Sequence, residues 1–129
     1  MSFNKNMRVM IVDDYTTMLR ILSNLLRQLE ITNVEEANDG ETAFAAMQRN
    51  VPDLIISDWN MVPMTGLDLL RKVRADARLR HIPFIMVTAE SKTENVIAAK
   101  KSGVSNYIVK PFNAETLRAK IASVCPVTA

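Results

Sequence analysis

The stretch LIISDWNMVPMTG, residues 54–66, decides the fold. Its first four residues, LIIS, are typical of a strand that is buried on both faces. Asp58 ends this run, and the chain then turns through Pro63 toward Gly66. A carboxylate is costly to place at the end of a buried strand unless it has a partner. Asp58 is therefore the first candidate for a functional residue.

The pattern of a short apolar run followed by a longer amphipathic segment occurs five times along the chain. In residues 15–29, for example, leucines recur at spacings of three and four, which predicts a helix. Strict alternation of strands and helices predicts an α/β domain with a parallel sheet and helices on both faces. The expected strands are 7–12, 33–37, 53–58, 83–89 and 106–110, and the expected helices are 15–29, 39–50, 65–76, 91–103 and 113–124.

Length and composition favour one ordinary globular domain. The chain has 129 residues, 48% of them apolar and 23% charged, which predicts a single domain over 1–129 with no output domain. No apolar run is long enough for a membrane span, and the first residues are too few to form a secretory signal, so we expect no membrane insertion and a cytoplasmic protein. A net charge of +2 gives no argument for direct binding of nucleic acid.

Polar residues follow four of the five predicted strands. They are Asp13 and Asp14, Asp58, Thr88, and Lys110. The carboxyl ends of parallel strands share one edge of a sheet, so these side chains are expected to converge there. Any one of them could be a solvated loop residue, but their convergence from separate strands indicates a functional site.

Charge suggests what the site would bind. Three neighbouring carboxylates repel one another, and Lys110 compensates only one of them. A divalent cation would neutralise the rest, and an all-oxygen set with no His or Cys suits Mg²⁺. A carboxylate can then act as a nucleophile toward phosphorus. Asp58 is the expected nucleophile because it stands alone, whereas Asp13 and Asp14 form a pair suited to a metal.

This ordered set resembles the receiver domain of two-component response regulators. The resemblance spans nearly the whole chain, through VDDY (12–15), SDWNM (57–61), VTAE (87–90) and VKPF (109–112), and is strongest toward chemotaxis response regulators. It implies a flavodoxin-like α/β fold, with a five-stranded parallel sheet in the order 2-1-3-4-5 and five helices on both faces. It also implies a signalling domain that assists its own phosphorylation and dephosphorylation and is not an enzyme.

The resemblance assigns Asp58 as the phosphoacceptor and Mg²⁺ as the cofactor. Direct metal ligands would be Asp14, Asp58 and the backbone carbonyl of Asn60, with Asp13 acting through a metal-bound water. Lys110 and the Thr88 hydroxyl would contact phosphoryl oxygens.

Further roles implied by the resemblance concern signalling. Tyr107 would be the switch aromatic that responds to Thr88, and Asn60 and Glu90 would tune dephosphorylation. The surface of helix 91–103, strand 106–110 and helix 113–124 would carry the signal. The implied partners of this monomer are a histidine kinase, an output protein such as a flagellar motor switch component, and a phosphatase.

Other functions remain open at this point. A phosphorelay intermediate, or a phosphate sink between histidine proteins, would need the same site. An aspartate-nucleophile phosphohydrolase would need a second acid two residues after the nucleophile, where this chain has Asn60. Flavin mononucleotide binding would need a phosphate-binding loop after the first strand, where two acids stand instead.

Overall fold

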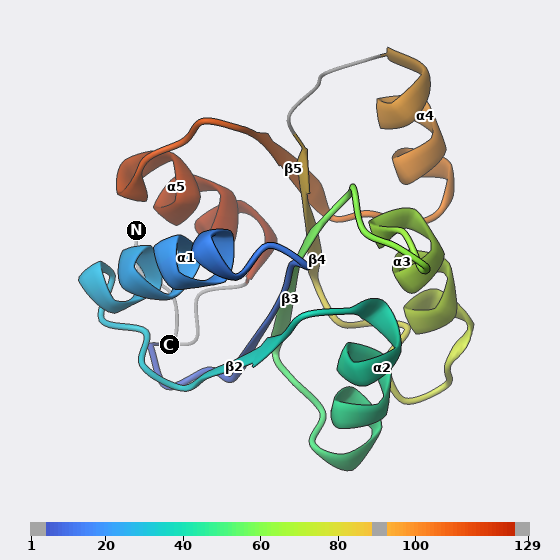
Figure 1. Cartoon of the computed structure of the whole chain (residues 1–129), viewed down its shortest axis with the longest axis horizontal. Coiled ribbons are helices and arrows are strands. Elements are labelled where there is room, and N and C mark those ends of the chain that lie inside the picture. The colour runs from blue at the N-terminus through green and yellow to red at the C-terminus, as the bar shows by residue number, and fades with distance from the viewer. Residues whose placement is uncertain (1–4, 89–92, 126–129) are drawn as a thin grey trace.

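A computed structural model describes residues 5–88 and 93–125 of the chain. Five parallel strands form one sheet in the order β2-β1-β3-β4-β5, which confirms the predicted topology (Figure 1). The strands are β1 (Val9–Val12), β2 (Val34–Ala37), β3 (Leu54–Asp58), β4 (Phe84–Thr88) and β5 (Asn106–Val109). The helices are α1 (Thr16–Gln28), α2 (Gly40–Arg49), α3 (Gly66–Ala75), α4 (Thr93–Lys101) and α5 (Ala114–Val124).

The helices cover both faces of the sheet. α1 and α5 lie on one face, and α2, α3 and α4 lie on the other (Figure 1). Successive strand residues point to opposite faces, so β1 sends Ile11 into the core under α1 and α5 and Met10 into the core under α2 and α3. The strands β1, β3 and β4 are buried along their whole length, as their apolar sequences predict.

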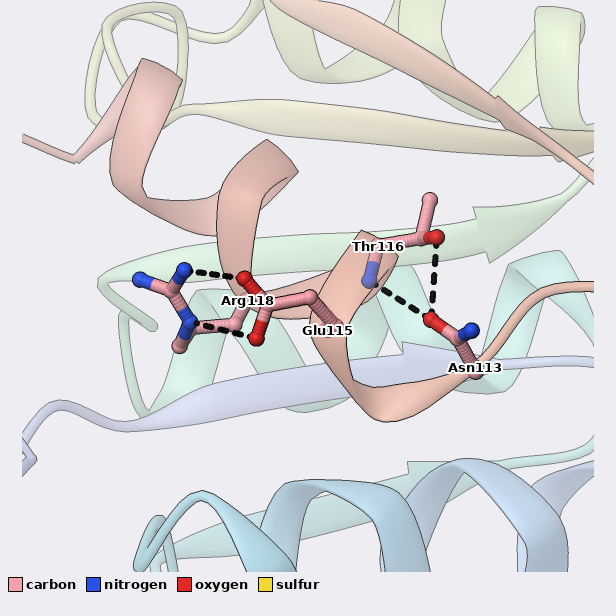
Figure 2. Close-up of polar contacts among 4 residues, drawn as sticks. All are labelled: Asn113, Glu115, Thr116 and Arg118. Carbon is pink, nitrogen blue, oxygen red and sulfur yellow. Dashed lines mark hydrogen bonds and ion pairs between the residues drawn. The ribbon is translucent and has the colours of Figure 1, made fainter.

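Three helices begin at side chains that cap free backbone N–H groups. Asp39 accepts from the Thr42 N–H at 2.7 Å before α2, and Thr65 forms a reciprocal capping box with Asp68 before α3. Asn113 accepts from the Thr116 N–H at 2.8 Å before α5 (Figure 2). These capping residues can be recognised in the sequence. The predicted starts of α2, α3 and α5 therefore lie within two residues of the observed starts.

The prediction from sequence was wrong for part of the buried face of α3. The spacing of apolar residues in 65–76 predicts an inward face of Leu67, Leu70 and Val73, but Leu67 is only half-buried and Leu69 is fully buried. The buried face comprises Gly66, Leu69, Leu70 and Val73. This spacing places the start of α3 directly on the sheet. Ser91, the predicted start of helix 91–103, lies outside the described residues.

Arg74 joins α3 to the segment after α4. Its guanidinium donates to the carbonyl oxygens of Gly103 at 2.8 Å and of Ile82 at 2.7 Å. Burial lowers the pKa of the Arg74 guanidinium below its ordinary value.

Within 5–88 and 93–125, no helix has both the length and the apolar character needed to cross a membrane.

Candidate functional site

The carboxyl edge of the sheet gathers the predicted polar residues. Asp13 directly follows β1, Asp58 ends β3, Thr88 ends β4, and Lys110 directly follows β5. Parallel register brings them level, since Asp58 pairs with Val87 and Thr88 pairs with Val109. The backbone N–H of Lys110 also donates to the Thr88 carbonyl at 2.8 Å. These polar residues therefore meet at one edge of the sheet because the strands are parallel.

Three carboxylates form the centre of the site. Asp13, Asp14 and Asp58 each offer an oxygen, and these atoms lie within 4.8 Å of one another. Asp13 and Asp58 are buried, at 1% and 5% exposure, while Asp14 is exposed to solvent. The cluster therefore has a closed side and an open side, through which a ligand could enter.

Lys110 is the cation of the site. Its Nζ lies 2.8 Å from Asp58 Oδ1 and 3.9 Å from Asp13 Oδ2. Among the described residues, neither of these two buried oxygens has a hydrogen-bond partner, and Lys110 contacts them as an ion-pair partner. One cation is thus shared by two buried acids, and their coordination is incomplete.

The incomplete coordination fits a divalent cation. The available donors are carboxylate oxygens, which suit a hard ion such as Mg²⁺. A cation would also approach the two oxygens that lack hydrogen bonds. The residues present therefore match the predicted metal, with the exposed Asp14 on the accessible side.

Burial changes the titration of Asp13. Burial is the main cause that raises the pKa of its carboxyl from 3.8 to about 6, and the nearby charge of Asp58 raises it further. The Tyr15 N–H, which donates to Asp13 Oδ1 at 2.9 Å, and the Lys110 charge oppose this rise. In the metal-free protein, ionised Asp13 is therefore an unfavourable element of the fold at neutral pH.

Replacing Asp13 by Asn should stabilise the metal-free protein. A carboxyl whose pKa is raised in the folded state weakens that state as pH rises from about 4 through about 6. A rise in the pKa from 3.8 to about 6 corresponds to about 3 kcal/mol at neutral pH. We expect Asp13→Asn to raise the free energy of unfolding by up to this amount at pH 7.5, and by little near pH 4, in urea titrations with a chelator.

Asp14→Asn is the matched control for that measurement. It removes the same charge from the neighbouring, solvent-exposed position. Its effect on the free energy of unfolding should be smaller. An equal gain from both substitutions, or a gain from Asp13→Asn that persists near pH 4, would contradict the explanation by burial.

The remaining predicted residues lie around the cluster or outside it. Asn60 is exposed two residues after Asp58, and Tyr107 is half-buried on β5, where it packs beside the core under α2 and α3. Glu90 lies outside the described residues. The roles predicted for Asn60, Glu90 and Tyr107 stay predictions.

Sequence reasoning assigned no role to Gly66. A Cβ atom at this position would lie 2.2 Å from the backbone oxygen of Asp58, closer than any real contact. The Gly66 N–H also donates to the Trp59 carbonyl at 2.9 Å. The start of α3 thus fixes the backbone that carries Asp58. A glycine at the first position of a helix was the only signal in the sequence.

Comparisons with known proteins agree with this geometry. Residues 9–122 match the family model described as the response regulator receiver domain. The chain is 50% identical over 121 residues to "Chemotaxis protein CheY-3" of Vibrio cholerae, covering 94% of this chain and 93% of that protein. It is 52% identical over 118 residues to "Chemotaxis protein CheY" of Pseudomonas aeruginosa, covering 92% and 95%.

A solved structure supports the same assignment. The chemotaxis response regulator CheY4 of Vibrio cholerae matches with a TM-score of 0.86 and 35% sequence identity, covering 92% of this chain and 98% of that chain. The family model covers most of the chain, and the two relatives are at least 50% identical to it over more than nine tenths of its length. The chain therefore belongs to the response regulator receiver domain family.

Proposed function

We propose that the chain accepts a phosphoryl group on Asp58 in a reaction that requires Mg²⁺. The observation that carries this proposal is the pair of buried, incompletely coordinated carboxylates beside Lys110. Asp58 stands on the middle strand of the sheet, where its oxygen can reach an incoming phosphorus atom. Family membership supports the reading, because receiver domains are signalling domains with this acidic cluster.

The transfer is a displacement at phosphorus. An Asp58 oxygen would form the new P–O bond as the P–N bond to a histidine of a kinase breaks, and the imidazole leaves with the bonding electron pair. Lys110 would exchange part of its contact with Asp58 for a phosphoryl oxygen, and the Thr88 hydroxyl would donate to another. Asp14, Asp58 and the Asn60 carbonyl would hold Mg²⁺ directly, and Asp13 would act through a metal-bound water. When bound, the ion would supply positive charge that offsets the negative charge of the site.

The names of the relatives support a proposal for the partners. Relatives at about half identity are named as chemotaxis proteins, so we place this chain in chemotaxis, with a histidine kinase as donor. The surface of α4, β5 and α5 would then contact an output protein such as a flagellar motor switch component, and a phosphatase would act at the open edge of the site. A phosphorelay intermediate would use the same phosphoacceptor chemistry, but the relatives are named as chemotaxis proteins, which favours the first function.

Dependence on Mg²⁺ tests the proposal. Incubation with acetyl phosphate and Mg²⁺ should increase the intact mass by one phosphoryl group, and a chelator should prevent the increase. Asp14→Asn removes a proposed ligand from the exposed side of the cluster. It should raise the Mg²⁺ concentration for half-maximal labelling by about tenfold or more, because one charged ligand of a weakly held ion is lost. Labelling that is independent of Mg²⁺ would refute this assignment.

A further inference from the structure

A cation lies over the ring of Tyr107. Nζ of Lys120, from α5, is 5.3 Å from the centre of the ring, a distance at which an ammonium group is attracted to an aromatic face. Tyr107 and Lys120 are both half-buried, so water screens this contact less than it would on an open surface. The side of Tyr107 toward α5 is therefore covered by a charged group.

Asn106 connects this contact to the backbone. Its Oδ1 accepts the Tyr107 N–H at 2.8 Å and a longer bond, 3.4 Å, from Lys120 Nζ. Its Nδ2 donates to Ser123 Oγ at 2.9 Å, and Ser123 Oγ donates to the Lys120 carbonyl at 2.7 Å. The start of β5 and the last turns of α5 are thereby joined by one closed network, which fixes where the Lys120 ammonium can lie.

Arg118, a second cationic residue of α5, has a different partner. Arg118 forms a two-pronged ion pair with Glu115, one turn earlier on the same helix (Figure 2). Lys120 has no carboxylate within ion-pair distance in the part of the chain that the structure describes. Among the described residues, its charge is therefore directed to the Tyr107 ring and to Asn106.

We infer that Lys120 of α5 is a positioning residue that holds the Tyr107 side chain in its half-buried place on β5, beside the core under α2 and α3. Its importance for signalling rests on the role of switch aromatic that the family resemblance predicts for Tyr107. Loss of the Lys120 charge would remove the attraction on one face of the ring, so the ring would populate other positions. The chemistry at Asp58 would stay the same, because the contacts of the Lys120 ammonium group within 5–88 and 93–125 are with Tyr107 and Asn106 and not with the acidic cluster.

Resonances of the tyrosine rings give a direct test. The chain has two tyrosines, so ring-labelled protein gives two sets of signals, and the exposed Tyr15 is an internal reference. In the full chain without Mg²⁺ or phosphodonor, we expect a nuclear Overhauser effect between the Lys120 ε-methylene and the Tyr107 ring. Lys120→Met keeps the length of the side chain but removes the charge, and should shift the Tyr107 signals alone. Lys120→Arg should largely restore them.

Arg118→Met is the matched control. It removes a cation two residues away on the same helix and should leave the Tyr107 signals unchanged. Tyr107 signals that are identical in the wild type and Lys120→Met, or that shift equally in Arg118→Met, would overturn the inference.

Phosphoryl labelling separates this inference from the proposed function. Lys120→Met should be labelled by acetyl phosphate and Mg²⁺ at a rate within about twofold of the wild type. A wild type that takes no phosphoryl group would refute the proposed function, while the ring signals would still decide the role of Lys120. A labelling rate in Lys120→Met that falls tenfold or more would contradict the separation between Lys120 and the acidic cluster.

Discussion

Asp58→Asn should reduce the acetyl phosphate-dependent gain in mass to background. The amide has nearly the shape of the carboxylate but carries no charge and is a far weaker nucleophile, so no acyl phosphate can form at this position. The other two carboxylates of the cluster have different proposed roles, since Asp13 accepts the Tyr15 N–H and Asp14 is a proposed metal ligand. Intact-mass spectrometry of wild type and variant under equal labelling conditions provides the measurement.

Asp53→Asn is the control for this experiment. It makes the same chemical change just before the opposite end of β3, where Asp53 accepts a hydrogen bond from the Arg8 N–H at 2.8 Å. An Asn side chain can still accept that bond, so the fold and the labelling should both be retained. If Asp58→Asn is labelled as fully as Asp53→Asn, Asp58 is not the phosphoacceptor.

Gly66→Ala should destabilise the fold by about 3 kcal/mol, the upper part of the usual range for overpacking. The new methyl group would meet the Asp58 carbonyl oxygen at 2.2 Å and Met86 Sδ at 2.8 Å. The first of these atoms belongs to the backbone of a buried strand, so either α3 or the end of β3 must move. Urea unfolding of both proteins measures the change in free energy, and phosphoryl labelling should fall with it because Asp58 is displaced.

Gly40→Ala provides a control with the same change in composition. Gly40 is also the first residue of a helix, and an added methyl group there would meet Met64 Sδ at 2.6 Å. That atom is near the end of a flexible side chain, which can turn away. Gly40→Ala should therefore cost much less free energy than Gly66→Ala. Equal losses would show that the close contact with Asp58 is not the cause.

The fold was predictable because its signals are local. A buried strand such as 54–58 shows as an apolar run, and helix starts show as capping residues such as Asp39 and Asn113. The set of polar residues at the site followed from one rule about parallel sheets, without any knowledge of distances. Thr88 and Lys110 therefore lie, as predicted, at the same edge of the sheet as the three aspartates.

Contacts between distant segments could not be predicted in this way. The approach of Gly66 to the Asp58 carbonyl depends on how closely α3 packs on the sheet, and the approach of Lys120 to Tyr107 depends on the rotation of α5. Leu67 shows the same difficulty, since the spacing of apolar residues in α3 allowed two adjacent faces. Periodicity gives the face of a helix to within about one residue, and tertiary packing selects between the options.

Two buried oxygens, Asp13 Oδ2 and Asp58 Oδ1, accept no hydrogen bond from residues 5–88 and 93–125, and they make thermal denaturation a reporter of ligand state. Any ion that binds these oxygens in the folded chain, and not in the unfolded one, shifts the melting temperature with its concentration. Such a shift requires no kinase, no output protein and no optical probe. Competing metal ions could therefore be ranked by melting curves alone, and occupancy could be followed even in a variant that cannot be labelled.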